Sequence, residues 1–572
     1  MDEESEVQDE GVVSLAAECA KLWPGMLLKS SEEEGRLKDE KEVTEGPGVE
    51  HPAHSALTEA DTHTIRVDVM RTRGNHPAFG PQMRERLREL LTQLCLKEKI
   101  RYMQGLHEVA AVFAYIESTE GFHPTESTES TDASSRTLEC FMAFVRNFMP
   151  CFYDAESFVI LHITLLFFRQ LLLYHLPHLH NQLEEAGVAP VVYATPWFIT
   201  LFAYKNPLHV TMRLWHEYIR RGDPTFVPFL AVALMELEKQ AFLNVEEDDL
   251  NSAVDRTRIT SLEKLRDVWK AAESLHARTP KSFTFRMSKV LTQVRQQLRK
   301  ETGHPWTESV LARAEQERRL ALLAREAIAQ YVRVSEAGTA VPSSGLPSLR
   351  VLLLDVRPRS AFDAEHLPHA VHFHPPCLAR LAQATNGSRR SAERLAQALK
   401  QAMVEVGDLV LRKDSTPTMA AEDDGLGAEV FQSLQLAASE AWGEGWLSES
   451  ERAHLAILGG EEDWDSAQLC RPGAVAALFE LLAEQLSMPR VSVVLGGAAV
   501  LHREAEKRGV PTTATPPTPA AAAAESAAAG AERLRGFLSK TATGARSAFQ
   551  SFPSFKRDGK AKDAKDAKGS ES

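Results

Sequence analysis

Two short stretches decide how this sequence folds: TIRVDVMRTRGNHPAF at residues 64–79 and RYMQGLHEV at residues 101–109. In the first, Ile65, Asp68 and Arg71 lie three residues apart, the spacing that brings side chains onto one face of a helix. We therefore expect a helix on which the Asp68 carboxylate orients the Arg71 guanidinium. An ordinary surface pair of this kind is worth less than about 1 kcal/mol, so the spacing alone does not assign a function.

The sequence around these stretches has the period of α-helices. An apolar stripe runs along residues 81–99, formed by Met83, Leu87, Leu90, Leu91 and Leu94. Further helices are predicted at 138–148, 156–174, 178–186, 197–204, 208–221 and 225–243, and a long polar one at 307–332. Residues 64–335 therefore read as an all-α domain with a helical extension.

Residues 158–173 are the most apolar part of the chain, but they are fewer than the ~20 needed to cross a bilayer and include Arg169. We interpret them as a core helix of a soluble protein. His175, His178 and His180 follow closely but do not form an HExxH pattern, so we assign no metal site.

The two quoted stretches also carry a recognisable pair of motifs. The residues that match IxxDxxRT and YxQG are Ile65, Asp68, Arg71, Thr72, Tyr102, Gln104 and Gly105. The ordered pair resembles the finger motifs of the TBC family of Rab GTPase-activating proteins. The resemblance implies that Arg71 is an arginine finger and Gln104 a glutamine finger, supported by Asp68, Tyr102 and Gly105. It also implies a Rab-family small GTPase as partner and no cofactor of the chain's own, because GTP and magnesium belong to that partner.

The residue types suit that chemistry. Negative charge builds on the phosphate oxygens as the bond to the γ-phosphate breaks, and a planar guanidinium can neutralise it. An arginine supplied in trans is worth about 10³–10⁵ in rate. A glutamine amide can hold the attacking water in line.

A different pattern begins after residue 348. Short apolar runs at 349–356, 454–460 and 490–497, with helical stretches at 391–405 and 471–487, predict a small parallel α/β sheet. The stretch VLLLDVRPRSAFDAEHLPHAVHFHP at 351–375 resembles the beginning of a rhodanese domain. The matching residues are Asp355, Arg357, Phe362, His366, Leu367, Pro368 and Ala370.

A catalytic rhodanese needs a thiolate in a loop that follows a later strand. In this chain the run HLAILGG is followed by Glu461, Glu462 and Asp463, whose charges would repel an anionic sulfur species, and Cys470 lies about ten residues beyond the run. We therefore expect a binding module without sulfurtransferase activity.

Composition limits the remaining choices. A net charge of -14 argues against general binding to nucleic acids, and six scattered cysteines without a CxxC pair suggest neither a zinc site nor a disulfide framework. From Ala531 onward ten Lys/Arg face five Asp/Glu, and residues 531–557 have a helical apolar period, so this tail either contacts an anionic membrane or stays solvated.

The predicted organisation has five parts. They are an N-terminal helix that ends before Pro24 and a flexible insertion (1–63), the TBC domain with its extension (64–335), a linker (336–348), the rhodanese-like domain (349–509) and a low-complexity linker with a basic tail (510–572).

This pairing of domains resembles the family of TBC domain family member 23 proteins. The resemblance implies a cytoplasmic protein, peripheral at the trans-Golgi network and endosomal vesicles, in endosome-to-Golgi retrograde transport. It also implies golgin tethers and an endosomal actin-regulating complex as partners. In that family the TBC domain is regarded as a non-catalytic tethering adaptor without fingers, whereas this chain retains Arg71 and Gln104 and has little room for a folded domain after the rhodanese-like part. We favour a Rab activator and keep the adaptor as the alternative.

Overall fold

The computed structural model describes residues 11–28, 57–122, 132–154, 158–300, 319–329, 351–368, 370–372, 454–464, 473–485 and 487–512. The chain divides into two units, Met1–Pro516 and Pro517–Ser572, and every described residue belongs to the first. The predicted helix at 391–405, Cys470 and the basic tail at 531–557 lie outside the described residues.

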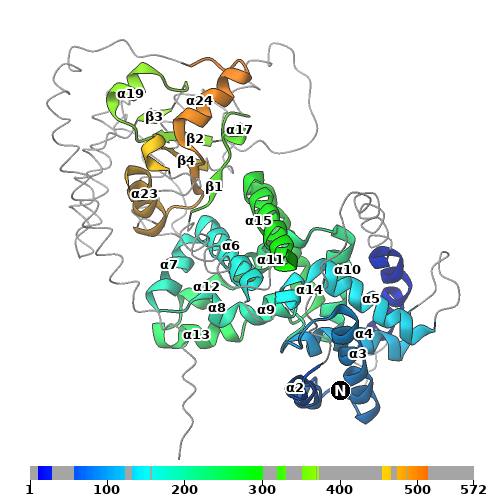
Figure 1. Cartoon of the computed structure of the whole chain (residues 1–572). Helices are drawn as coiled ribbons and strands as arrows, with labels where there is room; N and C mark the ends of the chain where they lie inside the picture. Colours follow the sequence, from blue (N-terminus) through cyan, green and yellow to red (C-terminus); the bar gives the residue numbers. More distant parts are fainter. Residues whose placement is uncertain are drawn as a thin grey trace, which may run out of the picture. The chain divides into compact units, whose positions relative to one another are not determined.

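Helices make up the first part of the described chain (Figure 1). After the N-terminal helix Gly11–Leu28 they are α2 (Glu59–Arg71), α3 (Pro81–Glu98), α4 (Leu106–Thr119), α5 (Ala133–Phe148), α6 (Val159–His175), α7 (Pro177–Glu185), α8 (Pro190–Tyr193), α9 (Thr195–Ile199), α10 (Leu208–Arg221), α11 (Val227–Leu237), α12 (Lys239–Leu243), α13 (Glu247–Asp255), α14 (Leu262–Arg278) and α15 (Lys281–Lys300). Short 3-10 turns occur at Pro150–Asp154 and Pro224–Phe226. The all-α prediction for this region is confirmed over residues 57–300 wherever they are described.

The N-terminal helix packs inside the core of this helical part. Trp23 is fully buried, with its ring centroid 5.6 Å from that of Phe113 and 6.3 Å from that of Trp215. By length and composition this helix could cross a membrane, but Ala16, Cys19 and Trp23 are buried in the core. It also continues past Pro24, where the sequence predicted its end. Burial of Leu27 beyond the proline offsets part of the roughly 3 kcal/mol that an interior proline costs.

Helix α6 is the buried core helix that the sequence predicted. Its residues from Val159 to Tyr174 are mostly buried, and it contacts α7, α11 and α15.

Two other helix predictions are wrong. The stretch 197–204 is helical only to Ile199, because Leu201 and Phe202 adopt left-handed backbone angles that end the helix.

The predicted helix at 307–332 is wrong over its described residues. Ala321–Leu322 form the strand β1, and a short helix α17 follows at Ala324–Ala327. Because β1 pairs with the strand β5 (Val491–Val494), this stretch belongs to the sheet and not to a helical extension. A two-residue strand is too short to leave a period-2 pattern in the sequence.

The sheet is parallel throughout its described strands. Its strands are β1, β2 (Val351–Asp355), β3 (Val371–His372), β4 (His454–Leu458) and β5 (Val491–Val494), in the order β1-β5-β4-β2-β3. The three apolar runs of the sequence correspond to β2, β4 and β5, so the predicted parallel sheet is confirmed. Other elements of this part are α19 (Arg359–Ala364), a 3-10 turn (Glu461–Asp463), α23 (Ala474–Phe479), a π-helical turn (Glu480–Gln485) and α24 (Gly497–Lys507).

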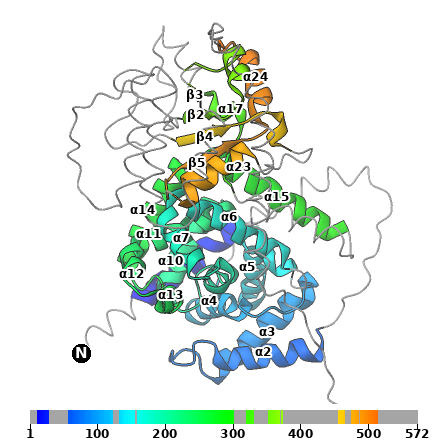
Figure 2. The ribbon, with the colours of Figure 1, turned by 90° about the vertical axis from the view of Figure 1, so that its left-hand side faces the viewer.

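Helices cover both faces of this sheet (Figure 2). Val351, Leu353 and Ala456 pack with Leu501 of α24 in one apolar cluster, which also includes α17. Side chains alternate along a strand, so Leu352 and Leu354 point to the opposite face, where α23 contacts β4 and β5. Burial on both faces explains why the strands read as continuous apolar runs.

Polar contacts join the helical part to the sheet. The hydroxyl of Tyr174 on α6 hydrogen-bonds the Nδ1 atom of His454 on β4, and the Arg490 amide donates to the Tyr174 carbonyl at 2.7 Å. On α7, the Asn181 amide donates to the carbonyl of Glu484 at 2.7 Å and contacts Ser487 at 2.8 Å. Tyr174 and His454 are both buried, so these bonds form away from water.

Replacing Trp23 with alanine tests whether the N-terminal helix is part of the helical core. Removing a buried tryptophan leaves a cavity, so we expect Trp23→Ala to lower the free energy of unfolding by about 3–5 kcal/mol. Leu22→Ala is the matched control, because Leu22 is 41% exposed. Urea unfolding followed by circular dichroism measures both, and equal stability of the two variants would contradict the packing.

Acid should weaken the contact between Tyr174 and His454. Burial, with the positive charges of Arg490 and Arg278, lowers the pKa of His454 to about 3. An unfolded histidine has a pKa of about 6.5, so from about pH 6.5 to pH 3 the unfolded chain binds a proton that the native chain does not. Stability is complete above that range and falls within it by up to about 1.4 kcal/mol per pH unit.

The variant His454→Asn keeps an acceptor for Tyr174 but does not titrate. Urea unfolding at a series of pH values should show a shallower acid loss for this variant than for the wild type. Identical slopes would mean that His454 is not held neutral.

Candidate functional site

Helix α2 is fixed at its start to the turn that precedes α4. Thr58 and Asp61 form a capping box, in which each side chain bonds the backbone amide of the other residue. The Asp61 carboxylate also accepts two hydrogen bonds from Arg101, at 2.9 and 3.1 Å. Since Arg101 precedes Tyr102, this pair brings the second motif against α2.

Asp68 is the centre of the site. Its Oδ1 atom lies 2.6 Å from Arg71 Nη2, and its Oδ2 atom accepts a hydrogen bond of 2.7 Å from the Tyr102 hydroxyl. Asp68 is only 2% exposed. Burial acts to raise the pKa of this carboxyl, but the hydrogen bond from Tyr102 and the positive charge of Arg71 hold the pKa below its usual value. Asp68 is therefore a buried anion that ties α2 to the turn before α4.

Arg71 and Gln104 both reach solvent. The Arg71 side chain is 52% exposed although Asp68 holds it, and Gln104 is exposed in the turn between the buried residues Met103 and Gly105. The structure thus brings the predicted residues Asp68, Arg71 and Tyr102 into direct contact, and the Asp68–Tyr102 bond joins them to the turn that carries Gln104.

Gly105 can only be glycine at this position. Its φ is +106°, which strains any residue with a Cβ atom, and a Cβ atom there would lie 3.0 Å from Ile199 Cδ1 and 3.4 Å from Thr200 Cγ2. The YxQG motif therefore needs its glycine so that α4 can begin directly after Gly105, against the end of α9.

Arg73 is a residue of the site that sequence reasoning missed. Its side chain donates to the carbonyls of Ala203 at 2.9 Å and Asn206 at 3.0 Å, and its Nε atom lies 3.5 Å from Glu108 Oε2. Burial lowers the pKa of Arg73, and Glu108 opposes that shift. Its carbonyl partners lie more than a hundred residues further along the chain, so no local spacing could have revealed them.

His107 and Glu108 were missed as well. His107 is 5% exposed, and its Nδ1 atom lies 3.1 Å from the Tyr102 hydroxyl and 3.4 Å from Asp68 Oδ2. The signal available in the sequence was a pair of titratable residues, His107 and Glu108, which follow the YxQG motif after one residue.

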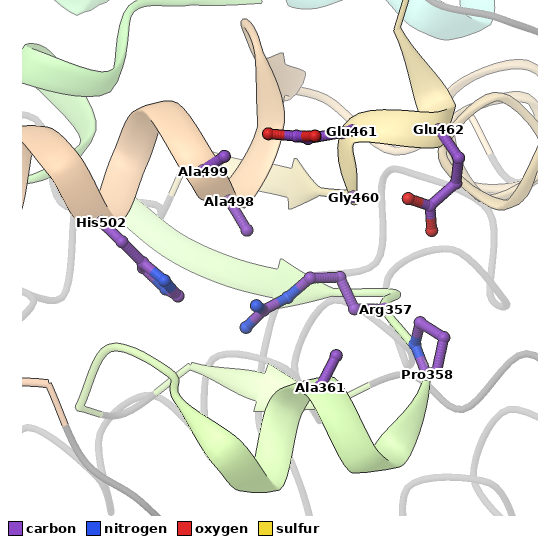
Figure 3. Close-up of a pocket in the computed structure, with 9 residues that line it drawn as sticks. All are labelled: Arg357, Pro358, Ala361, Gly460, Glu461, Glu462, Ala498, Ala499 and His502. Atoms are coloured by element: carbon purple, nitrogen blue, oxygen red, sulfur yellow. The ribbon is translucent and has the colours of Figure 1, made fainter.

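A second candidate site lies at the carboxyl ends of β2 and β4 (Figure 3). The cavity measures about 310 Å³ and is lined by Arg357, Pro358, Ala361, Gly460, Glu461, Glu462, Ala498, Ala499 and His502. Arg357 is held by Asp355, with Nη2 2.7 Å from Oδ2, and donates to the Glu365 carbonyl at 2.8 Å. His502 Nδ1 lies 3.1 Å from Glu365 Oε2.

The loop after β4 carries carboxylates where a rhodanese would need a thiolate. Glu461 and Glu462 are exposed at the cavity, and no cysteine is among its described lining residues. Asp463 accepts from the Gly460 amide at 2.9 Å, and burial raises the pKa of Asp463 to about 6. This loop would repel an anionic sulfur species.

The described residues hold no group of three or more His, Cys, Asp or Glu arranged for a metal ion. His175, one of the three neighbouring histidines, instead has its Nε2 atom 2.7 Å from the Thr279 hydroxyl.

Replacing Gly105 with alanine tests the close approach of Ile199. The strained backbone costs about 1–3 kcal/mol, and the contact with Ile199 adds to it. Gly187→Ala is the matched control, because Gly187 also has a positive φ, +68°, but has open space around it. We expect a larger loss of unfolding free energy for Gly105→Ala, partly recovered when Ile199→Ala is added. Equal losses for the two glycine variants would show that Ile199 does not constrain the turn.

Comparisons with known proteins identify the helical part. The family model described as the Rab-GTPase-TBC domain matches residues 20–243. A TBC domain-containing protein kinase-like protein from Homo sapiens is 26% identical over 198 residues, which are 33% of this chain and 21% of that protein. TBC1 domain family member 4 from Mus musculus is 29% identical over 239 residues, 41% of this chain and 16% of that protein. The matches thus span about a fifth of these relatives or less.

Among solved structures, the Ypt/Rab-GAP domain of Gyp1p is similar with a TM-score of 0.33 at 14% identity, over 40% of this chain and 74% of that one. The family match begins inside the N-terminal helix and includes α2, the YxQG turn and α10. Residues 20–243 of this chain are therefore a Rab-GTPase-TBC domain.

Proposed function

We propose that the chain activates GTP hydrolysis by a Rab-family GTPase, with Arg71 and Gln104 supplied in trans. The observation that carries the proposal is the buried Asp68 carboxylate, which binds Arg71 at 2.6 Å and Tyr102 at 2.7 Å. One anion thus fixes an exposed guanidinium and the turn of an exposed carboxamide. In an ordinary ion pair on a helix surface, the carboxylate would be exposed and would not also bind a residue outside the helix, as Asp68 binds Tyr102.

The role of Arg71 follows from charge. When GTP is hydrolysed, the bond between the γ-phosphorus and the bridging oxygen breaks, and negative charge spreads over the phosphate oxygens. The Arg71 guanidinium has donors that Asp68 does not occupy, and the side chain is half exposed. It can therefore enter the nucleotide site of a partner and neutralise that charge without losing its own support.

Gln104 would act on the other side of the phosphate. Its amide offers both a donor and an acceptor, so it can hold the attacking water in line. The positive φ of Gly105 and the start of α4 fix the turn from which Gln104 projects. Positioning and electrostatics are the contributions that phosphoryl transfer needs from a protein.

A GTP hydrolysis assay over a panel of Rab GTPases tests this function. We expect the wild-type chain to accelerate hydrolysis by at least one of them. Arg71→Ala should lower the stimulated rate by a factor of about 10³–10⁵. Arg71→Lys should not restore it, since an ammonium cannot reproduce the planar fork. Gln104→Ala should reduce the same rate.

Arg66→Ala is the matched control. Arg66 is an exposed arginine of the same helix that contacts His63, and its loss should leave the rate unchanged. Stimulation that survives Arg71→Ala would contradict the assigned role.

The non-catalytic adaptor is the second candidate, and the pairing of a TBC domain with an α/β part that has carboxylates after β4 favours it. In that case no GTPase of the panel is stimulated, and Arg71→Ala leaves recruitment to the trans-Golgi network intact. Endosome-to-Golgi transport, golgin tethers and an endosomal actin-regulating complex belong to this proposal. The α/β part is then a rhodanese-like binding module, and the cavity beside Arg357 is its candidate binding site.

A further inference from the structure

His107 lies where the two motifs of the TBC domain meet. It is the second residue of α4, and its side chain is only 7% exposed. Its Nδ1 atom faces three groups: the Gly105 amide at 3.3 Å, the Tyr102 hydroxyl at 3.1 Å and Asp68 Oδ2 at 3.4 Å. One ring nitrogen therefore contacts the turn of Gln104, the tyrosine of that motif and the carboxylate that holds Arg71.

The Gly105 amide determines the state of that nitrogen. A backbone N–H can only donate, and this one points at Nδ1, so Nδ1 must present a lone pair. The ring hydrogen then lies on Nε2, which faces Glu108 Oε1 at 3.8 Å. A hydrogen on Nδ1 would point at the Gly105 hydrogen and leave that buried amide without its acceptor.

Each carboxylate near the His107 ring has an arginine beside it. Asp68 is bound by Arg71 and Tyr102, and Glu108 lies 3.5 Å from Arg73. His107 stands between these two pairs. The Tyr102 hydroxyl donates its hydrogen to Asp68 at 2.7 Å, and its oxygen lies 3.1 Å from Nδ1.

We propose that His107 is a positioning residue for the glutamine finger, with its Nδ1 lone pair accepting a hydrogen bond from the Gly105 amide. This inference rests on the proposed activator function. The imidazole touches neither GTP nor the attacking water. It fixes the Gly105 amide, and with it the turn from which Gln104 projects beside the Asp68–Tyr102 bond.

Two substitutions separate this role from simple packing. His107→Leu fills the site but has no acceptor, whereas His107→Asn places an amide oxygen near the position of Nδ1. We expect His107→Leu to lower the maximal stimulated hydrolysis rate about 10- to 100-fold, as for a misplaced reacting group, with the half-saturating concentration of the chain little changed. His107→Asn should recover most of that rate. His162→Leu, at an exposed histidine of α6, is the matched control.

A second measurement does not depend on activity. Hydrogen exchange of the full-length chain, read by mass spectrometry on peptides that span Gly105, should be faster in His107→Leu than in the wild type and near wild type in His107→Asn. Equal protection in all three proteins overturns the inference, as does full stimulation by His107→Leu when Arg71→Ala is inactive. If the wild type stimulates no GTPase, the activator function fails, and the exchange rates alone decide whether His107 holds the turn.

Discussion

The site depends on a carboxylate that has been removed from water. A buried anion is tolerated only when hydrogen bonds and opposite charge replace its hydration. Asp68 receives both, from the Tyr102 hydroxyl and from Arg71. Because its two partners come from different elements, the need to satisfy one anion also sets the relative position of α2 and the turn before α4. Loss of either partner leaves the other in place beside an incompletely compensated charge.

The loop that follows α9, residues 200–206, contacts this arrangement and has an unusual backbone conformation. Leu201, Phe202 and Lys205, which follow α9, all have left-handed backbone angles, and the partly buried Arg73 holds their loop through the carbonyls of Ala203 and Asn206. Ile199, at the end of α9, is also the residue that leaves room only for glycine at position 105. Such strain persists where the surroundings impose it, and it commonly occurs at functional sites. The end of α2 and the Gln104 turn thus both contact the segment that follows α9.

The sequence predicted those features of the structure that depend on the spacing of residues close together in the chain. Helical stripes identified the all-α part, and the interval between Asp68 and Arg71 predicted their contact. Apolar runs predicted β2, β4 and β5. The prediction failed where residues in contact are far apart in the chain, or where a helix or strand is very short. The helix predicted at 197–204 ends early because of the left-handed residues after Ile199, and β1 is visible only through its pairing with β5. Arg73 and His107 act through folded contacts, which no motif spacing encodes.

The α/β part is bound to the TBC domain through its most buried elements. Tyr174 belongs to α6, the apolar core helix, yet both its hydroxyl and its carbonyl are used by the sheet, through His454 and the Arg490 amide. Glu326, beside β1, accepts from the backbone amides of Lys281 and Ser282 at the start of α15. Separation would expose a buried tyrosine and histidine and leave those amides without their acceptor. Because polar groups of the helical core are hydrogen-bonded by residues of the sheet, we expect the two parts to fold together. The α/β part therefore contributes to the stability of the TBC domain, in addition to any binding function that it has.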